Sequence, residues 1–275
     1  MSEPEKFDDD ILYYYNRGRE AERLVSEHSR VEHARTLDVL ERYLPDAPAT
    51  VLDIGGGPGR YAVWLAERGH TVHLLDPVPL HVDQATEALK AHEQATATLG
   101  DARALPYPDA HADAVLLLGP LYHLTERADR VKALREVYRV LKSGGLLFAA
   151  AISRFSLFIE GLTLDTLGAE NFVEMNSAVI ETGIHRNLER QEGLFTTSYF
   201  HLPEELREEV IEAGFEDATL FGLEGPARYL RNFDGAWEDE RKRSNLLTML
   251  RTIEIENSLL GSSPHLLAVA RKNGT

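Results

Sequence analysis

The segment VLDIGGGPGR, residues 51–60, decides the fold of this chain. A short apolar run meets four glycines within five residues, and a helical pattern follows directly. Glycine serves where the backbone turns sharply and where a ligand approaches it without side chains in the way. The next apolar run ends at Asp76, 21 residues beyond Gly55, where an acid commonly binds ribose hydroxyls in α/β nucleotide sites. This order of elements predicts a ligand site over the carboxyl ends of parallel strands, near a helix N-terminus.

Strands and helices alternate around this segment. Continuous apolar runs, typical of strands buried on both faces, predict strands at residues 51–54, 71–75, 97–99, 113–118 and 146–152. Apolar residues at helical spacing predict helices at residues 61–68, 80–92 and 127–141. Strands alternating with helices imply right-handed crossovers and a parallel sheet that helices cover on both faces. The predicted class is therefore α/β.

The alternation stops after the fifth strand. Residues 153–200 show no clear strand and are predicted to be mostly helical. Beyond them we expect a helix from Pro203 to Gly214, a strand at 218–223, a helical stretch at 235–260 and a strand at 265–270. Before the core, a helix is expected from Ser29 to about Leu44, ended by Pro45 and Pro48.

These elements predict one domain over residues 1–275. It would consist of an N-terminal helical cap at 1–44, a ligand-binding core at 45–152, a helical lid insertion at 153–200, and closing strands with an inserted helix at 201–275.

Composition narrows the class of protein. The chain has 275 residues, enough for one large domain, and its net charge of −16 argues against a nucleic-acid partner. Without cysteine it has no disulfide and no thiolate metal site. The acidic N-terminus does not resemble a signal peptide, and the apolar runs are too short to span a bilayer. We therefore expect a cytoplasmic, soluble protein with no membrane association.

Two motifs compete for the glycine loop. The dinucleotide fingerprint Gly-x-Gly-x-x-Gly fails because Arg60 stands at its third glycine. The pattern Asp-x-Gly-x-Gly-x-Gly fits Asp53, Gly55, Gly57 and Gly59. That pattern resembles motif I of class I, Rossmann-like methyltransferases that depend on S-adenosylmethionine. The resemblance extends to residues 99–102, 113–124 and 139–145, and it covers roughly residues 50–152.

The resemblance implies a fold, a cofactor and a set of binding residues. The family's sheet has seven strands in the order 3-2-1-4-5-7-6, with strand 7 antiparallel. The implied cofactor is S-adenosylmethionine. Its methionine part would lie against the glycine loop and Asp53, its ribose on Asp76, and its adenine beside Pro77, Asp101 and the Ala102 backbone, with the Leu118 carbonyl at its amino end. Each acid has an alternative interpretation as a loop cap or turn residue.

Candidates for catalysis follow the fourth strand. His123 is the best candidate for a general base, with Tyr122 beside it to bind or stack on substrate. The alternative is that Tyr122 packs and His123 caps a helix. His185 in the predicted lid is a second candidate base. The other histidines are not accompanied by carboxylates at ligand spacing, so no metal site is predicted.

Two segments outside the core are candidates for covering the site. Residues 13–15 are three tyrosines, and by resemblance Tyr14 would lie over the cofactor, although the tyrosines would equally serve to dock a helix. Residues 155–200 would form a mobile lid over an apolar acceptor pocket; a helical homodimer interface is the alternative.

The predicted function is methyl transfer to a small-molecule acceptor at oxygen, nitrogen or carbon. Three alternatives remain open on the sequence: methylation of RNA or protein, a cofactor-binding protein without catalysis, and an NAD-dependent oxidoreductase, against which Arg60 argues.

Overall fold

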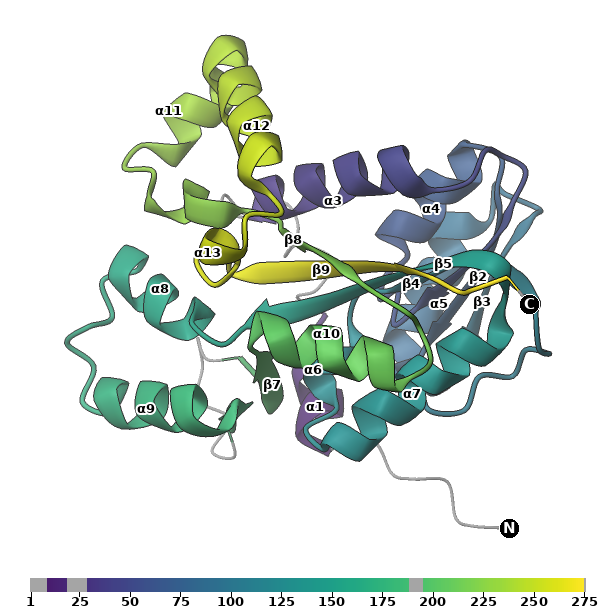
Figure 1. The fold of residues 1–275 in the computed structure, drawn as a ribbon, viewed down its shortest axis with the longest axis horizontal. Helices are drawn as coiled ribbons and strands as arrows, with labels where there is room; N and C mark the ends of the chain where they lie inside the picture. Colours follow the sequence, from purple (N-terminus) through teal and green to yellow (C-terminus); the bar gives the residue numbers. More distant parts are fainter. Residues whose placement is uncertain (1–8, 19–28, 188–194, 275) are drawn as a thin grey trace.

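The computed structural model describes residues 9–18, 29–187 and 195–274. Within them, a mixed sheet has the order β3-β2-β1-β4-β5-β9-β8 (Figure 1). Only β9 runs against its neighbours among these seven strands. The predicted α/β class and the order 3-2-1-4-5-7-6 are confirmed. The strands are β1 Thr50–Ile54, β2 Thr71–Asp76, β3 Ala95–Leu99, β4 Ala112–Leu117, β5 Leu141–Ser153, β8 Thr219–Gly222 and β9 His265–Arg271.

Helices cover both faces of the sheet. On one face the helices are α3 Ser29–Tyr43, α4 Arg60–Glu67 and α5 Pro79–Leu89, and on the other they are α6 Pro120–His123, α7 Arg127–Val140 and α10 Pro203–Glu212. Alternate residues of a strand point to opposite faces. Val51 of β1 therefore joins the cluster under α3 and α4, whereas Leu52 and Ile54 join the cluster under α7 and α10. The continuous apolar strands supply both cores.

The insertion after β5 is helical in part. Helices α8 Ser156–Thr163 and α9 Phe172–Thr182 fit the prediction. The expectation of no strand in this region is wrong, because β6 Ile184–His185 and β7 Ser198–His201 form a small hairpin. β7 pairs in parallel with the last two residues of β5. Strands this short carry no readable alternation, and it is their pairing with the end of β5 that defines them.

The remaining helices flank the ends of the sheet. Helix α1 Asp9–Tyr15 packs Ile11 and Tyr15 against Val78, at the carboxyl end of β2. The C-terminal stretch folds as η1 Gly225–Tyr229, α11 Phe233–Glu238, α12 Glu240–Ile253 and α13 Asn257–Leu260. In the part of the chain that the structure describes, no helix combines the length and the apolarity that crossing a membrane requires.

Candidate active site

The glycine loop joins the end of β1 to α4. Gly55 and Gly59 have φ angles of 71° and 92°, a left-handed conformation that side chains disfavour. A Cβ atom at Gly55 would lie 2.6 Å from Cδ of Pro120, and one at Gly59 would lie 3.2 Å from Cβ of Ala85. The loop therefore needs glycine both for its backbone conformation and for its close approach to α6 and α5.

Asp76 ends β2, and its buried carboxylate ties this loop to the start of α5. Its Oδ2 accepts a hydrogen bond from the Gly57 N–H at 2.9 Å. Its Oδ1 accepts from the Val78 N–H at 2.9 Å and lies 3.1 Å from His81 Nδ1. All four residues line one pocket at the carboxyl ends of β1, β2 and β4.

Asp53 lies behind the loop and is fully buried. A side chain at Gly56 would come within 2.6 Å of its Oδ2, so the carboxylate packs directly beneath the loop backbone. Burial, followed by the negative charge of Asp76, raises the pKa of Asp53 to about 7. A cation bound in the pocket would favour the ionised form of Asp53, because opposite charges stabilise each other at short range.

Asp101 follows β3 and lines the opposite side of the pocket, next to Ala102. It accepts hydrogen bonds from the backbone N–H of Arg103 at 2.8 Å and from its guanidinium at 2.7 Å. Arg103 also pairs with Asp129 of α7 at 2.8 Å. Asp101 therefore caps the turn after β3, as its alternative interpretation proposed, and it also lines the pocket.

Helix α1 covers the pocket with Tyr15. The Tyr15 hydroxyl lies 2.7 Å from Nε2 of His123, the last residue of α6. The Tyr15 ring also packs edge-on against the imidazole of His81, with ring centroids 5.1 Å apart. Ile11, one helical turn before Tyr15, lines the same pocket. This spacing defines the inward face of α1.

Further aromatic rings extend from the pocket towards the segment inserted after β5. Tyr122 and His123 have ring centroids 4.7 Å apart, and Phe195, just before β7, lies 5.7 Å from His123. Tyr14 packs against Phe195 at 5.4 Å. Of the two adjacent tyrosines, Tyr15 and not the predicted Tyr14 lines the pocket, because Tyr15 shares the helix face of Ile11.

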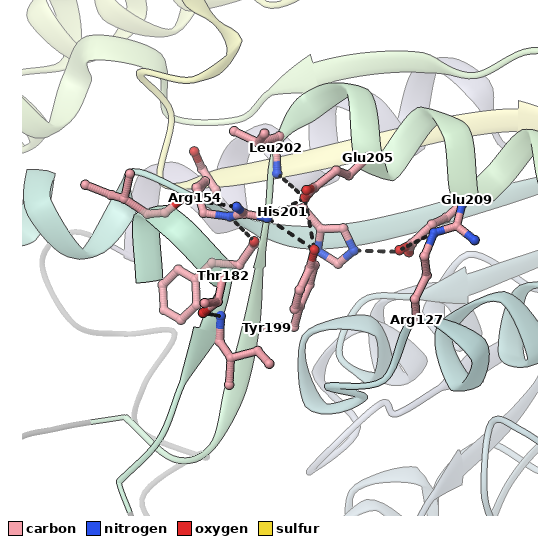
Figure 2. Close-up of polar contacts among 12 residues, drawn as sticks. Arg127, Arg154, Thr182, Tyr199, His201, Leu202, Glu205 and Glu209 are labelled. Carbon is pink, nitrogen blue, oxygen red and sulfur yellow. Dashed lines mark hydrogen bonds and ion pairs between the residues drawn. The ribbon is translucent and has the colours of Figure 1, made fainter. Parts of the chain in front are cut away.

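A buried polar network fixes β7 to the core beside this wall (Figure 2). Arg154, directly after β5, donates to the Phe200 carbonyl at 2.6 Å and to Glu205 at 2.6 Å. Arg130 donates to Glu209 at 2.7 Å, and Glu209 lies 3.2 Å from Nε2 of His201. Every carboxylate of this network is paired with an arginine.

His185 occupies a different place from the one expected of a base. It lies in β6 and does not line the described pocket. Its Nε2 is 3.1 Å from the Phe195 carbonyl, and burial lowers its pKa. The ring thus holds the hairpin together, and its assignment as a base stays a prediction that this geometry does not favour.

The structure brings eight of the predicted site residues together. The pocket lining contains Gly55, Gly57, Asp76, Pro77, Asp101, Ala102, Tyr122 and His123. Predicted residues outside the lining are Asp53, Gly59, Leu118, Tyr14 and His185. Lining residues that the sequence analysis missed include Ile11, Tyr15, Val78 and His81. A signal for His81 was present, because it lies in the first turn of the helix that follows Asp76.

One cluster within the described residues has the spacing of metal ligands. Glu32, Glu224 and His265 place one ligand atom each within 4.8 Å of one another. His265 Nδ1 is hydrogen-bonded to Glu224, and Ser263 donates to the second oxygen of Glu224 at 2.9 Å. Burial opposes ionisation, but His265 and these donors hold the pKa of Glu224 below its ordinary value. Hydrogen bonds already account for this cluster, and we assign no metal to it.

Comparison with known proteins identifies this domain. Residues 51–145 match the model of a family described as "Methyltransferase domain". A protein of Mycobacterium tuberculosis named as an uncharacterized methyltransferase is 38% identical over 110 residues, covering 40% of this chain and 42% of that protein. A demethylmenaquinone methyltransferase of Deinococcus radiodurans is 37% identical over 107 residues, covering 38% and 43%. The chain thus spans about two fifths of the length of these relatives.

A solved structure extends the likeness to the whole fold. A protein of Thermotoga maritima, described as an S-adenosylmethionine-dependent methyltransferase and possible histamine N-methyltransferase, superposes with a TM-score of 0.59. The two are 20% identical, over 96% of this chain and 100% of that chain. The fold is the Rossmann-like fold of class I methyltransferases. Residues 51–145 therefore belong to the methyltransferase-domain family.

Proposed function

We propose that this chain is an active methyltransferase that uses S-adenosylmethionine to methylate a small organic acceptor at oxygen, nitrogen or carbon. One observation carries the proposal. A single pocket at the carboxyl ends of β1, β2 and β4 gathers the glycine loop, Asp76 and the Tyr15–His123 pair. The first two suit a nucleoside with an amino-acid tail, and the last suits proton transfer.

The residues present fit this cofactor. S-adenosylmethionine carries a sulfonium and an ammonium. The buried Asp76 lines the pocket and Asp53 lies buried behind the loop, where a nearby cation would favour its ionised form. The glycine loop leaves backbone, not side chains, to contact the ligand. The proposed contacts are Gly55, Gly57, Gly59, Asp53 and the Leu118 carbonyl for the methionine part, Asp76 for the ribose, and Pro77, Asp101 and Ala102 for the adenine.

The chain's own tasks are alignment and exclusion of water. When bound, the cofactor supplies an already activated methyl group for in-line displacement. Alignment of two reactants in one pocket lowers the barrier because their relative freedom is lost on binding. Helix α1 lies over the pocket with Ile11 and Tyr15, and its apolar inner face suits the exclusion of water.

His123 is the base that we propose for acceptors that must lose a proton. Its Nε2 is within hydrogen-bond distance of the Tyr15 hydroxyl, which fixes the orientation of the ring. Tyr122 lies against the same ring and would contact the acceptor. An acceptor that binds as a neutral amine needs no base, and for such an acceptor the pair would serve only to position it.

Residues 155–200 are proposed as a lid over the acceptor, although 188–194 lie outside the described residues. Their root lies at the same edge of the sheet as the pocket, because α8 follows the carboxyl end of β5. Helices α8 and α9 also expose apolar side chains, as a homodimer interface would: Phe158, Leu162, Val173 and Ile180. Hydrogen exchange separates the two. A lid slows its exchange when product and acceptor bind, whereas protection that follows protein concentration and ignores ligand identifies an interface.

Ligand binding tests the proposed function against its alternatives. S-adenosylmethionine or S-adenosylhomocysteine should raise the unfolding temperature, because a ligand that binds only the native state stabilises it. NAD and NADP should not, and the reverse pattern would support the oxidoreductase. Transfer of a labelled methyl group to pooled small amines, phenols and quinols should follow. If the protein binds S-adenosylmethionine but transfers no methyl group to these acceptors, to RNA or to protein, the result would support a cofactor-binding protein without catalysis.

A further inference from the structure

The carboxylate of Asp76 has less free hydrogen-bonding capacity than its position in the pocket suggests. A carboxylate offers about four lone-pair sites on two oxygens. Gly57 occupies one site on Oδ2, and Val78 and His81 occupy two sites on Oδ1. About one site, on Oδ2, is left for a ligand. A ribose has two hydroxyls, so Asp76 can accept from both only if one of its present partners withdraws.

The backbone partners are poorly placed to withdraw. The Gly57 N–H belongs to the glycine loop, and the Val78 N–H belongs to the turn that starts α5, so both would need a backbone rearrangement. His81 is the remaining partner. It is 3% exposed, lies one turn into α5 and lines the same pocket.

His81 also carries an unsatisfied group. A carboxylate can only accept, so the hydrogen shared with Asp76 belongs to His81 Nδ1. In the neutral ring Nε2 is then an acceptor. Within the described residues this buried Nε2 has no hydrogen-bond partner. Buried acceptors are nearly always satisfied, and a pocket residue with an unsatisfied acceptor therefore indicates a donor on the ligand.

We propose that His81 is a cofactor-binding residue that shares the ribose of S-adenosylmethionine with Asp76. One ribose hydroxyl donates to the remaining site on Asp76, and the other donates to Nε2 of His81. Asp76 holds the imidazole in the required tautomer through Nδ1. The inference rests on the proposed function, because it takes the ligand of this pocket to be S-adenosylmethionine.

Two substitutions separate the two nitrogens of His81. In His81→Asn the side-chain amide reaches about as far as Nδ1 and can still donate to Asp76, but nothing replaces Nε2. In His81→Gln the amide reaches about as far as Nε2. His92→Asn is a matched control, because His92 does not line the pocket. Thermal unfolding without ligand shows whether each variant is folded.

Calorimetry with S-adenosylhomocysteine and its 2′-deoxy and 3′-deoxy analogues is the test. One net hydrogen bond corresponds to a loss of about fivefold in affinity, which we expect in His81→Asn and not in His92→Asn. For the analogue that lacks the hydroxyl bound by His81, wild type and His81→Asn should have equal affinity, because neither protein can then make that hydrogen bond. His81→Gln should recover part of the affinity.

Three outcomes would overturn the inference. Wild-type affinity in His81→Asn would mean that His81 only holds Asp76. An equal loss for all three ligands would mean that the substitution disturbs the pocket without touching either hydroxyl. Tighter binding in His81→Asn would mean that His81 competes with the ribose for Asp76. If the wild-type protein binds no S-adenosylhomocysteine, the proposed function fails first, and that result is distinct from all three.

Discussion

Two pairs of acids in this protein, three of them buried and Glu205 half-buried, have opposite electrostatic surroundings. Beside the glycine loop, Asp76 accepts hydrogen bonds from two backbone amides and lies against a histidine, and the pKa of Asp53 is raised. Glu205 and Glu209, at the root of the insertion, are each paired with a buried arginine. There the pKa of Glu209 is lowered although burial opposes this, because His201 and Arg130 bond to its charged form.

This difference distinguishes acids suited to binding a ligand from acids that stabilise the fold. Within the described residues no arginine pairs with the acids near the loop, and a cationic ligand would favour the ionised form of Asp53, whose pKa is raised. The acids at the root are satisfied within the protein, and their arginines also bind backbone carbonyls of the insertion and of the α6–α7 turn. Asp53 and Asp76 therefore suit a ligand site, whereas Glu205 and Glu209 fix the insertion to the core.

Among the predicted changes in free energy, the largest should be the loss of stability on replacing Arg130. In Arg130→Met, Glu209 would lose its buried cation and keep the more exposed Arg127 at 3.9 Å, and the Leu124 and Thr125 carbonyls would lose their donor. Breaking a buried pair in this way costs about 3–5 kcal/mol. Urea denaturation should show that loss in the free energy of unfolding. The exposed Arg135 pairs with Glu212, and Arg135→Met should change stability by about 1 kcal/mol or less.

A double variant sharpens this result. Glu209→Gln in the Arg130→Met background removes the stranded charge, and most of the lost stability should return. A double variant as unstable as the single one would show that the arginine acts through its carbonyl contacts alone.

The Asp53→Asn variant should change the pH dependence of stability. The pKa of Asp53 is about 7 in the folded protein and 3.8 for an ordinary aspartate. Between these values the folded state binds more protons than the unfolded state, so this group makes the wild type less stable as pH rises. From pH 5 to pH 8 the variant should gain about 2–3 kcal/mol relative to the wild type. Denaturation curves at the two pH values measure this gain, and parallel profiles would contradict the raised pKa.

The smallest predicted change in free energy is the loss of ligand-binding free energy on replacing Asp76. Asp76→Ala removes a charged acceptor of the ribose, worth about 1.5–3 kcal/mol. The affinity for S-adenosylhomocysteine, measured by calorimetry, should fall at least about tenfold. Asp83→Ala, an exposed acid on α5, serves as the control. Unchanged affinity in Asp76→Ala would place the cofactor elsewhere.

Sequence reasoning predicted the loop and acids that line the pocket and an N-terminal segment that covers it, but not which residue of that segment faces inward. The glycine loop, Asp76 and Asp101 were found because each follows a strand, and the carboxyl ends of parallel strands meet at one edge of the sheet. Tyr14 was predicted but Tyr15 lines the pocket. Adjacent helical residues differ by about 100° in direction, and only the packing of α1 on Val78 shows which one faces inward. His81 was missed because its contact with Asp76 depends on how α5 packs against the end of β2.

The sequence by itself determined the alternation of strands and helices, the sheet order through its family resemblance, and the glycine loop at the pocket. These features depend on local periodicity and on glycine, which act over a few residues. Only the tertiary structure decided which rings close the pocket, how Asp76 divides its lone pairs, and which acids are neutralised. Those outcomes depend on contacts between residues far apart in the chain, such as Tyr15 with His123 and Arg130 with Glu209. No local pattern encodes such contacts, because packing of the whole sheet and its helices creates them.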